Sequence, residues 1–352
     1  MVLHEQFAWT SSPLIVNAPM GDFAGPDLAA AVSRAGGLGM IGAMLDPSVL
    51  STQLVRASEL LSDLKEGSGS SSGSSSLLPF GVGLILFALT NRRAQVIQVL
   101  QQHPPAVVWL FAEPELRDYT VWAEAIRQAL PGTQVWIQVS SVAGALELAR
   151  SAKPDVLVMQ GTDAGGHGWE RGAGIVSLVP ETKDDLARAG LPVRVAASGG
   201  IVDARGAAAA ITLGAEAVIM GTRFLASKEV EAHPEYQRQI IEARDGGQAT
   251  VRAVIFDELR GPNIWPTTYN GRALLSQSYD DHIAGVPIEQ IRESHTQAKA
   301  GDDKGWGESR RAVVWSGTGV GLVKEVLPAA EIVREVREGA KQVLQKASSQ
   351  WA

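Results

Sequence analysis

The stretch VRVAASGGIVDARGAAAAITLGAEAVIMGTRF, residues 193–224, decides the fold. It contains two short apolar runs, each followed by glycine, and an alanine-rich segment between them that opens at Asp203 and stops at Gly214. A strand, a glycine turn, a helix and a second strand in this order are typical of a βαβ unit, whose two strands run parallel. The stretch therefore predicts parallel strands joined by crossover helices.

The same rhythm continues towards the N-terminus. Strands are predicted near Leu14–Asn17, Gly37–Ile41, Phe80–Phe87, Ala106–Leu110, Gln134–Val139, Asp155–Gln160, Val193–Ala197 and Glu216–Met220. Helices are predicted at Pro26–Ala35, Pro47–Leu64, Asn91–Gln102, Glu115–Leu130, Val142–Ser151, Thr182–Ala189 and Asp203–Leu213. Eight such strands, several of them continuously apolar, predict an α/β fold of the (β/α)₈ TIM barrel type, with an open doubly wound sheet as the alternative.

The rhythm breaks after Met220, where no strand followed by a crossover can be recognised. We expect residues 1–225 and 305–352 to form the barrel, and residues 226–304 to form an inserted, mostly helical lid domain. The segment Leu322–Lys346 has apolar residues at helical spacing and is predicted to cover the barrel wall. The Ser/Gly-rich residues 66–76 are predicted to form a flexible loop.

Composition excludes several classes of function. The net charge of -7 and the absence of basic runs argue against nucleic acid as a partner. With no cysteine, redox chemistry has to come from a bound cofactor, and no histidine pattern with metal-ligand spacing suggests a metal. Neither a signal peptide nor an 18-residue apolar run is found, so we expect a cytoplasmic protein that does not enter the membrane.

Two glycine loops follow the last two predicted strands. Ser198-Gly199-Gly200 ends one strand and Gly221-Thr222 ends the next. Barrels often bind phosphate here, because glycine lets backbone N–H groups approach the oxyanion. Each loop alone could be an ordinary turn, but the pair predicts a phosphate site without identifying the ligand.

The run QGTDAGGHG, from Gln160 to Gly168, directly follows the sixth predicted strand. Its four glycines make the backbone thin, so that a flat cofactor can lie against it while His167 projects from the carboxyl end of the barrel. A neutral imidazole can accept a proton from an acidic carbon at physiological pH. A structural loop histidine is the competing interpretation, and the glycine-rich context favours a catalytic base.

These segments resemble the nitronate monooxygenases, formerly called 2-nitropropane dioxygenases. The landmarks of that family occur in its order over nearly the whole chain. They are Asn17-Ala18-Pro19-Met20-Gly21, Gln160 through Gly168, Ala197 through Ile201, Gly221 through Phe224, and Ser316 through Gly321.

The resemblance implies an FMN-containing barrel that oxidises nitronates with O₂ to carbonyl compounds and nitrite. His167 would deprotonate a nitroalkane or orient its nitronate. The implied cofactor contacts are Asn17, Ala18, Pro19, Met20, Gly21, Gln160, Gly165, Gly166, Ser198, Gly199, Gly200, Gly221, Thr222, Ser316, Gly317, Thr318 and Gly319. Thr318 departs from the glutamine that the family often has, and the Ser-rich insertion is unusual, which leaves the substrate open.

Other functions remain alternatives. The flavin-dependent enoyl-acyl-carrier-protein reductases and the quinone reductases are similar in sequence pattern and would use NAD(P)H. A non-catalytic flavin- or phosphate-binding barrel is a second class, while a nucleotide isomerase or dehydrogenase would want a cysteine. Substrate choice is expected to lie in the lid, and the oligomeric state stays open. The candidate lid contacts are Tyr236, Arg252, Trp265, Tyr269 and Tyr279.

Overall fold

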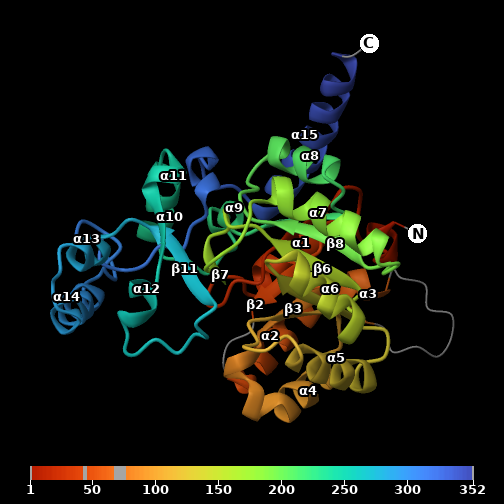
Figure 1. Ribbon diagram of the computed structural model, residues 1–352, viewed down its shortest axis with the longest axis horizontal. Helices are drawn as coiled ribbons and strands as arrows, with labels where there is room; N and C mark the ends of the chain where they lie inside the picture. The colour runs from red at the N-terminus through yellow and green to blue at the C-terminus, as the bar shows by residue number, and fades with distance from the viewer. Residues whose placement is uncertain (1, 43–45, 67–76, 351–352) are drawn as a thin grey trace.

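The computed structural model describes residues 2–42, 46–66 and 77–350, and its larger part is a barrel of parallel strands (Figure 1). The barrel strands are β1 (Leu14–Asn17), β2 (Met40–Gly42), β3 (Leu78–Ile85), β4 (Pro105–Phe111), β5 (Gln134–Val139), β6 (Val156–Gln160), β8 (Arg194–Ser198) and β9 (Ala217–Met220). They pair in the order β1-β9-β8-β6-β5-β4-β3-β2. The predicted eight-stranded barrel is therefore confirmed, whereas the predicted Ser/Gly loop falls almost entirely outside the described residues.

The ring closes between its first and last strands. A parallel bridge joins Val16 to Leu38, just before β2. The Asn17 side chain strengthens this closure, since its Nδ2 donates to the Met40 carbonyl at 2.8 Å and its Oδ1 accepts from the Met40 N–H at 2.9 Å. A short β2 and a single bridge thus suffice to complete the barrel.

Alternating side chains divide the core into two layers. Leu14 and Val16 of β1 belong to the cluster inside the barrel, whereas Ile15 between them belongs to the layer under the helices. The inner cluster includes the indoles of Trp109 and Trp136, whose centroids lie 6.1 Å apart. The N-terminal turn η1 (Leu3–Gln6) adds Leu3 to the same cluster. Large apolar side chains therefore fill the barrel.

Helices cover the outside of the barrel. They are α1 (Pro26–Arg34), α2 (Pro47–Leu60), α3 (Ser62–Glu66), α4 (Arg93–Gln102), α5 (Asp118–Ala129), α6 (Val142–Ser151), α7 (Ile175–Arg188), α8 (Ala204–Thr212) and α15 (Ala329–Ser349). Short 3₁₀ turns are η2 (Leu86–Ala88), η3 (Thr90–Arg92) and η4 (Thr318–Leu322).

Two predicted helices differ in extent from the observed ones. The predicted helix at 47–64 is interrupted at Leu61, a buried residue that separates α2 from α3. The predicted helix at 182–189 begins seven residues earlier, at Ile175, and contains Pro180. Proline normally marks a helix boundary because it lacks an N–H group, which explains why the first turns of α7 were missed.

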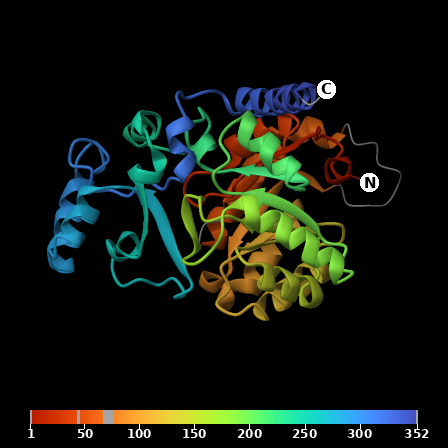
Figure 2. The same ribbon diagram turned by 45° about the horizontal axis from the view of Figure 1, so that its top comes forward.

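The C-terminal helix α15 lies along the barrel wall, as Figure 2 shows in dark blue. It packs against α8 and α1. Arg337 fastens it there, since its guanidinium donates to the carbonyls of Ala35 at 2.9 Å and Gly36 at 2.6 Å. The predicted position of this helix is confirmed, and its helical start shifts to Ala329.

The segment after β9 forms a smaller lobe beside the barrel (Figures 1 and 2). Its helices are α9 (Thr222–Leu225), α10 (Pro234–Glu242), α11 (Gly246–Ala249), α12 (Ile255–Glu258), α13 (Gln277–Ile283) and α14 (Ile288–Ala300). Besides helices, it contains the antiparallel strands β10 (Thr250–Ala253) and β11 (Tyr269–Leu274). No helix among the described residues has the length and apolar character to cross a membrane.

The small sheet has a third strand that comes from the predicted glycine loop. Residues 166–169 form β7 (Gly166–Trp169), which pairs with β11 so that His167 faces Gly271. Glycine is rare in strands, so nothing local in this run predicts a strand. The histidine therefore sits on an ordered strand that links the barrel to the lobe.

The lobe is hydrogen-bonded to residues beyond 304. The Gln277 N–H donates to Arg310 O at 2.9 Å, and the Leu274 N–H donates to Val314 O at 2.9 Å. Ala273 also forms a bridge with Trp315. A division of the chain at 304 would separate these hydrogen-bonded partners.

Candidate functional site

The predicted loops meet at one end of the barrel because parallel strands bring their carboxyl ends together. The Ala18 N–H donates to Met220 O at 2.9 Å, and the Gly161 N–H donates to Ser198 O at 2.8 Å. Segments following β1, β6, β8 and β9 are thus neighbours. The carboxyl ends of these strands are where a barrel usually carries its active site.

The loop Ser316–Gly319 ties the others together from the far end of the sequence. The Gly317 N–H donates to Thr222 Oγ1 at 3.0 Å, and the Thr318 hydroxyl donates to Asp163 Oδ1 at 2.8 Å. A Cβ on Gly317 would lie 2.5 Å from Asp163 O and 2.9 Å from Gly165 N, so only glycine fits this close to the loop 163–165. Thr318, the residue that departs from the family pattern, forms one of these links.

The residues after β1 divide into a structural and an open part. The Asn17 amide is used in closing the barrel, as described above, and the residue is fully buried. Ala18, Pro19, Met20 and Gly21 are half-buried. A Cβ on Gly21 would meet no atom within 4 Å, so open space adjoins this position.

Gln160 has one free polar atom in a buried position. Its Nε2 donates to His167 O at 3.0 Å, while its Oε1 is buried without a partner among the described residues. Gly166 has a φ of +66° and open space in the Cβ direction. Gly199 and Gly200 also have positive φ, at +106° and +76°, which explains two consecutive glycines after β8.

His167 is held by a carboxylate and two indoles. Its Nε2 lies 2.6 Å from Asp257 Oδ1, and both side chains are largely buried, at 15% and 6% exposure. The Trp265 ring stacks on the imidazole with centroids 3.6 Å apart and planes within 7°. Trp315 approaches it at 4.8 Å. The imidazole orientation is therefore strongly restrained.

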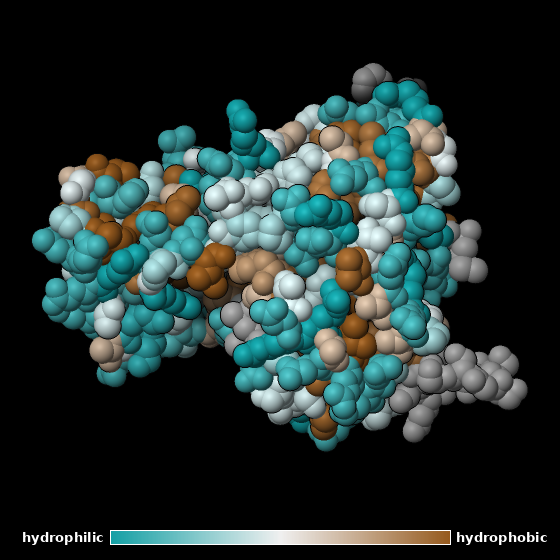
Figure 3. All heavy atoms as spheres, turned by 60° about the horizontal axis from the view of Figure 1, so that its bottom comes forward, coloured by the Kyte–Doolittle hydropathy of each residue, from teal (hydrophilic) through white to brown (hydrophobic). Residues whose placement is uncertain are grey.

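Aromatic side chains extend from this histidine over the ends of β3 and β4. Trp265 contacts Phe87 at 4.9 Å and Phe111 at 6.3 Å between centroids, and Tyr269 meets Phe111 edge-on at 5.4 Å. Figure 3 shows apolar side chains, in brown, around a hollow where the lobe meets the barrel. Such a surface favours an apolar substrate and limits the access of water.

Two arginines of the small sheet lie opposite each other and donate hydrogen bonds to the backbone just before His167. Arg252 donates to Ala164 O at 2.9 Å and to Asn270 O at 2.5 Å, and Arg272 donates to Thr162 O at 3.3 Å. Burial, together with the charge of Arg272, lowers the pKa of Arg252 to about 10. Arg252 thus keeps its charge at neutral pH, and both arginines fix the backbone around His167.

Glu113 is a buried carboxyl group at the end of β4. Its N–H donates to the Tyr119 hydroxyl at 3.3 Å, and its carbonyl accepts from the Tyr269 hydroxyl at 3.3 Å. Burial, reinforced by the charge of Asp118, raises the pKa of Glu113 to about 7. This group was not recognised from the sequence.

The candidate lid residues separate into two groups. Trp265, Tyr269 and Arg252 lie around His167, as described above. Tyr236 is buried and donates its hydroxyl to Trp315 O at 3.1 Å, and Tyr279 packs on Phe256 inside the lobe. Asp257, Trp315, Phe87 and Phe111 were missed, since an acid or aromatic residue far along the chain carries no local signal of its place beside a histidine.

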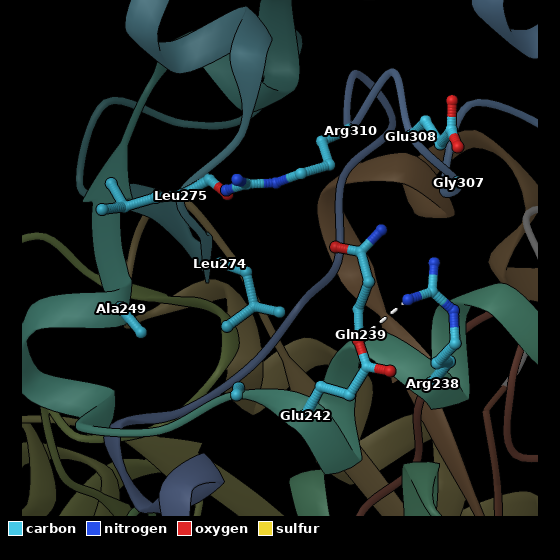
Figure 4. A pocket seen from close by; sticks show the side chains of 10 residues that line it. Arg238, Gln239, Glu242, Ala249, Leu274, Leu275, Gly307, Glu308 and Arg310 are labelled. Atoms are coloured by element: carbon cyan, nitrogen blue, oxygen red, sulfur yellow. Dashed lines mark hydrogen bonds and ion pairs between the residues drawn. The ribbon is translucent and has the colours of Figure 1, made fainter.

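A separate cavity of about 510 Å³ lies in the lobe (Figure 4). Residues of α10 form one wall, and the end of β11 and the segment 307–310 form others. Arg238 there is paired with Glu242 at 2.8 Å and with Glu235 at 2.6 Å. The lining residues include none of the predicted site residues, and the charge of Arg238 is already balanced.

The chain is similar in sequence to proteins of one family. The family model described as nitronate monooxygenase matches residues 87–339. A nitronate monooxygenase of Metarhizium robertsii is 45% identical over 97% of this chain and 95% of its own length. One from Neurospora crassa is 40% identical over 98% of this chain and 93% of its own length.

Solved structures share the fold. FabK from Thermotoga maritima superimposes with a TM-score of 0.76 at 26% identity, covering 99% of this chain and 98% of its own. Nitroalkane oxidase from Streptomyces ansochromogenes gives a TM-score of 0.73 at 24% identity, covering 98% and 99%. At this identity the second likeness is one of fold.

Proposed function

Because the chain belongs to the nitronate monooxygenase family, an oxidoreductase family, we propose that it is an FMN-dependent enzyme that oxidises alkyl nitronates with O₂ to carbonyl compounds and nitrite. His167 carries this proposal. Its imidazole is held by Asp257 and stacked by Trp265 next to the glycine loops at the carboxyl ends of the strands. A histidine in this position is suited to take a proton from an acidic carbon.

The residues at this end fit a flat cofactor that carries a phosphate. The unpartnered Oε1 of Gln160 could accept a hydrogen bond from a ring N–H. The open space beside Gly21 and Gly166 would admit the ring. The proposed cofactor contacts are the backbone from Asn17 to Gly21, Gln160, Gly165 and Gly166 for the ring, Ser198, Gly199, Gly200, Gly221 and Thr222 for the phosphate, and Ser316, Gly317, Thr318 and Gly319 for closing the pocket.

FMN, when bound, supplies the electron transfer that no side chain of this cysteine-free protein provides. His167 would take the proton from the carbon that bears the nitro group, or orient a nitronate that is already formed. Trp265, Phe111 and Tyr269 would line the alkyl side of the site and exclude water. Residues 226–304 would act as the lid that selects the substrate.

A reductase that uses NAD(P)H is the second candidate, and the likeness to FabK in fold is the observation that favours it. Anaerobic mixing separates the two. With the FMN-loaded protein, we expect ethyl nitronate to bleach the visible flavin absorbance and NADH or NADPH to leave it unchanged within the same time. Rapid bleaching by the nicotinamide alone would replace the proposal by the reductase.

The role of His167 is tested by His167→Asn. We expect kcat/KM for a neutral nitroalkane to fall by about 10²–10⁴-fold, because a general base contributes this much, while FMN stays bound. His282→Asn, an exposed histidine of the lobe, is the matched control and should keep full activity. Full activity in the His167 variant would remove the base assignment.

A further inference from the structure

The contact between His167 and Asp257 joins two parts of the chain 90 residues apart. His167 is on β7, and Asp257 is on α12 of the lobe. At 2.6 Å this is a short hydrogen bond between an imidazole and a carboxyl group, at a place where both side chains are largely removed from water. Aspartate is almost never this buried, at 6% exposure, unless it is paired, and His167 is its partner here.

The pair gives the two ring nitrogens of His167 different surroundings. Nε2 faces Asp257 Oδ1, and the stacked Trp265 ring prevents the imidazole from turning away. For Nδ1, no hydrogen-bond partner is found among the described residues. A carboxylate has only acceptor oxygens, so the ring nitrogen that faces Asp257 Oδ1 is the donor, and the ring proton is on Nε2. The lone pair of the neutral ring is then on Nδ1.

We propose that Asp257 is a positioning residue for the reaction: it holds His167 as the Nε2–H tautomer, so that Nδ1 is the atom that takes the substrate proton. This inference rests on the proposed role of His167 as base. As the proton arrives, the imidazole becomes a cation, and the nearby carboxylate stabilises it. β7 thus supplies the base, and α12 of the lobe supplies the carboxylate that orients it.

The tautomer can be observed directly, without turnover. In ¹⁵N-histidine-labelled protein with FMN, the signals of His167 are identified by their loss in His167→Asn, among six histidines. We expect two-bond couplings that identify a protonated Nε2 and a bare Nδ1 in the neutral ring, and a loss of this preference in Asp257→Asn. A neutral ring protonated on Nδ1 in the unmodified protein would overturn the proposal.

A kinetic comparison separates positioning from a merely structural role. For Asp257→Asn, we expect kcat/KM to fall about 100-fold with a neutral nitroalkane, because loss of an orienting partner commonly costs 10–100-fold or more. With preformed nitronate, which needs no proton abstraction, the loss should be less than about fivefold. Asp257→Glu, which keeps the carboxylate, should recover part of the nitroalkane activity. Equal losses on both substrates, or none, would contradict the proposal.

Glu258→Gln is the control, since it removes the same charge from the neighbouring position of α12. It should match the unmodified protein with both substrates. The unmodified enzyme also separates this inference from the proposed function. If it turned over neither substrate, the proposed function would fail, whereas the tautomer measurement would still decide whether Asp257 sets the state of His167.

Discussion

Glu113 is a buried carboxyl group, and its ionisation should change the unfolding free energy of the protein. Its pKa is raised from the ordinary value of 4.5 to about 7, first by burial and then by Asp118. The folded protein therefore favours the neutral acid more than the unfolded chain does. The resulting stabilisation is fully present below about pH 4.5 and is lost as the pH rises through about 7.

We therefore predict that Glu113→Gln removes part of the pH dependence of the unfolding free energy. Between pH 5 and 8, the unmodified protein should lose roughly 1–3 kcal/mol of unfolding free energy that the variant keeps. Denaturant titrations of both proteins across this range measure the difference. Glu115→Gln, an exposed neighbour, should follow the unmodified protein. Parallel curves for Glu113→Gln and the unmodified protein would show that the group ionises normally.

At the residue scale, the place of a residue at the end of a strand could be predicted from the sequence. The side chain that it contacts could not. The glycines and His167 could be placed because each follows an apolar run, and parallel strands end at one face. Asp257 could not be placed, because its contact with His167 depends on how the lobe folds. Asn17 illustrates a further limit: its place at the end of β1 was predicted, but its amide bonds to Met40 across the barrel closure.

At the scale of single elements, β11 is the strand that organises the lobe. It pairs with β10 on one side and with β7 on the other. Gly271, opposite His167, leaves room for the Trp315 ring, because a Cβ there would lie 2.2 Å from its Cζ3 atom. One absent side chain thus lets an indole reach the imidazole.

We predict that Gly271→Ala displaces Trp315. The clash should lower the unfolding free energy by about 1–3 kcal/mol, the usual cost of overpacking, and shift the tryptophan fluorescence. Combining it with Trp315→Leu should be less destabilising than the sum of the two single changes, since the second removes the clash. Strict additivity in denaturant titrations would mean that the ring does not press on this glycine.

The elements of the barrel could be predicted closely, and those of the lobe could not. Barrel strands are buried on both faces and so appear as apolar runs such as Val156–Met159. The lobe strands are partly exposed, as at Arg252, and half of β7 is glycine. Their pairing comes from contacts distant in sequence rather than from local preference.

At the scale of the whole molecule, α15 returns the chain to the barrel after the lobe. Arg337 of this helix is buried, with 6% exposure, and its hydrogen bonds reach Ala35 and Gly36 at the end of α1. Burial lowers the pKa of Arg337. The two ends of the barrel sequence are thereby joined.

We predict that Arg337→Met destabilises the whole fold by about 1–3 kcal/mol, because Ala35 O loses its donor and Gly36 O keeps only the Ser11 N–H, both at the barrel wall. Arg334→Met, on the exposed side of the same helix, should change stability by less than about 0.5 kcal/mol. Chemical denaturation of the three proteins measures the difference. Equal stability of both variants would mean that the hydrogen bonds of Arg337 are replaced by water.

The pairing of β7 with β11 has a consequence for exchanging parts between relatives. His167 is close in sequence to the barrel strand β6, but the strand that pairs with it, β11, belongs to the lobe. A chimera that took only the inserted segment from a homologue would pair a foreign β11 with the original β7 and separate His167 from Asp257. Two separate segments would have to be exchanged together. They are the lobe and the run from Gly161 to Glu170.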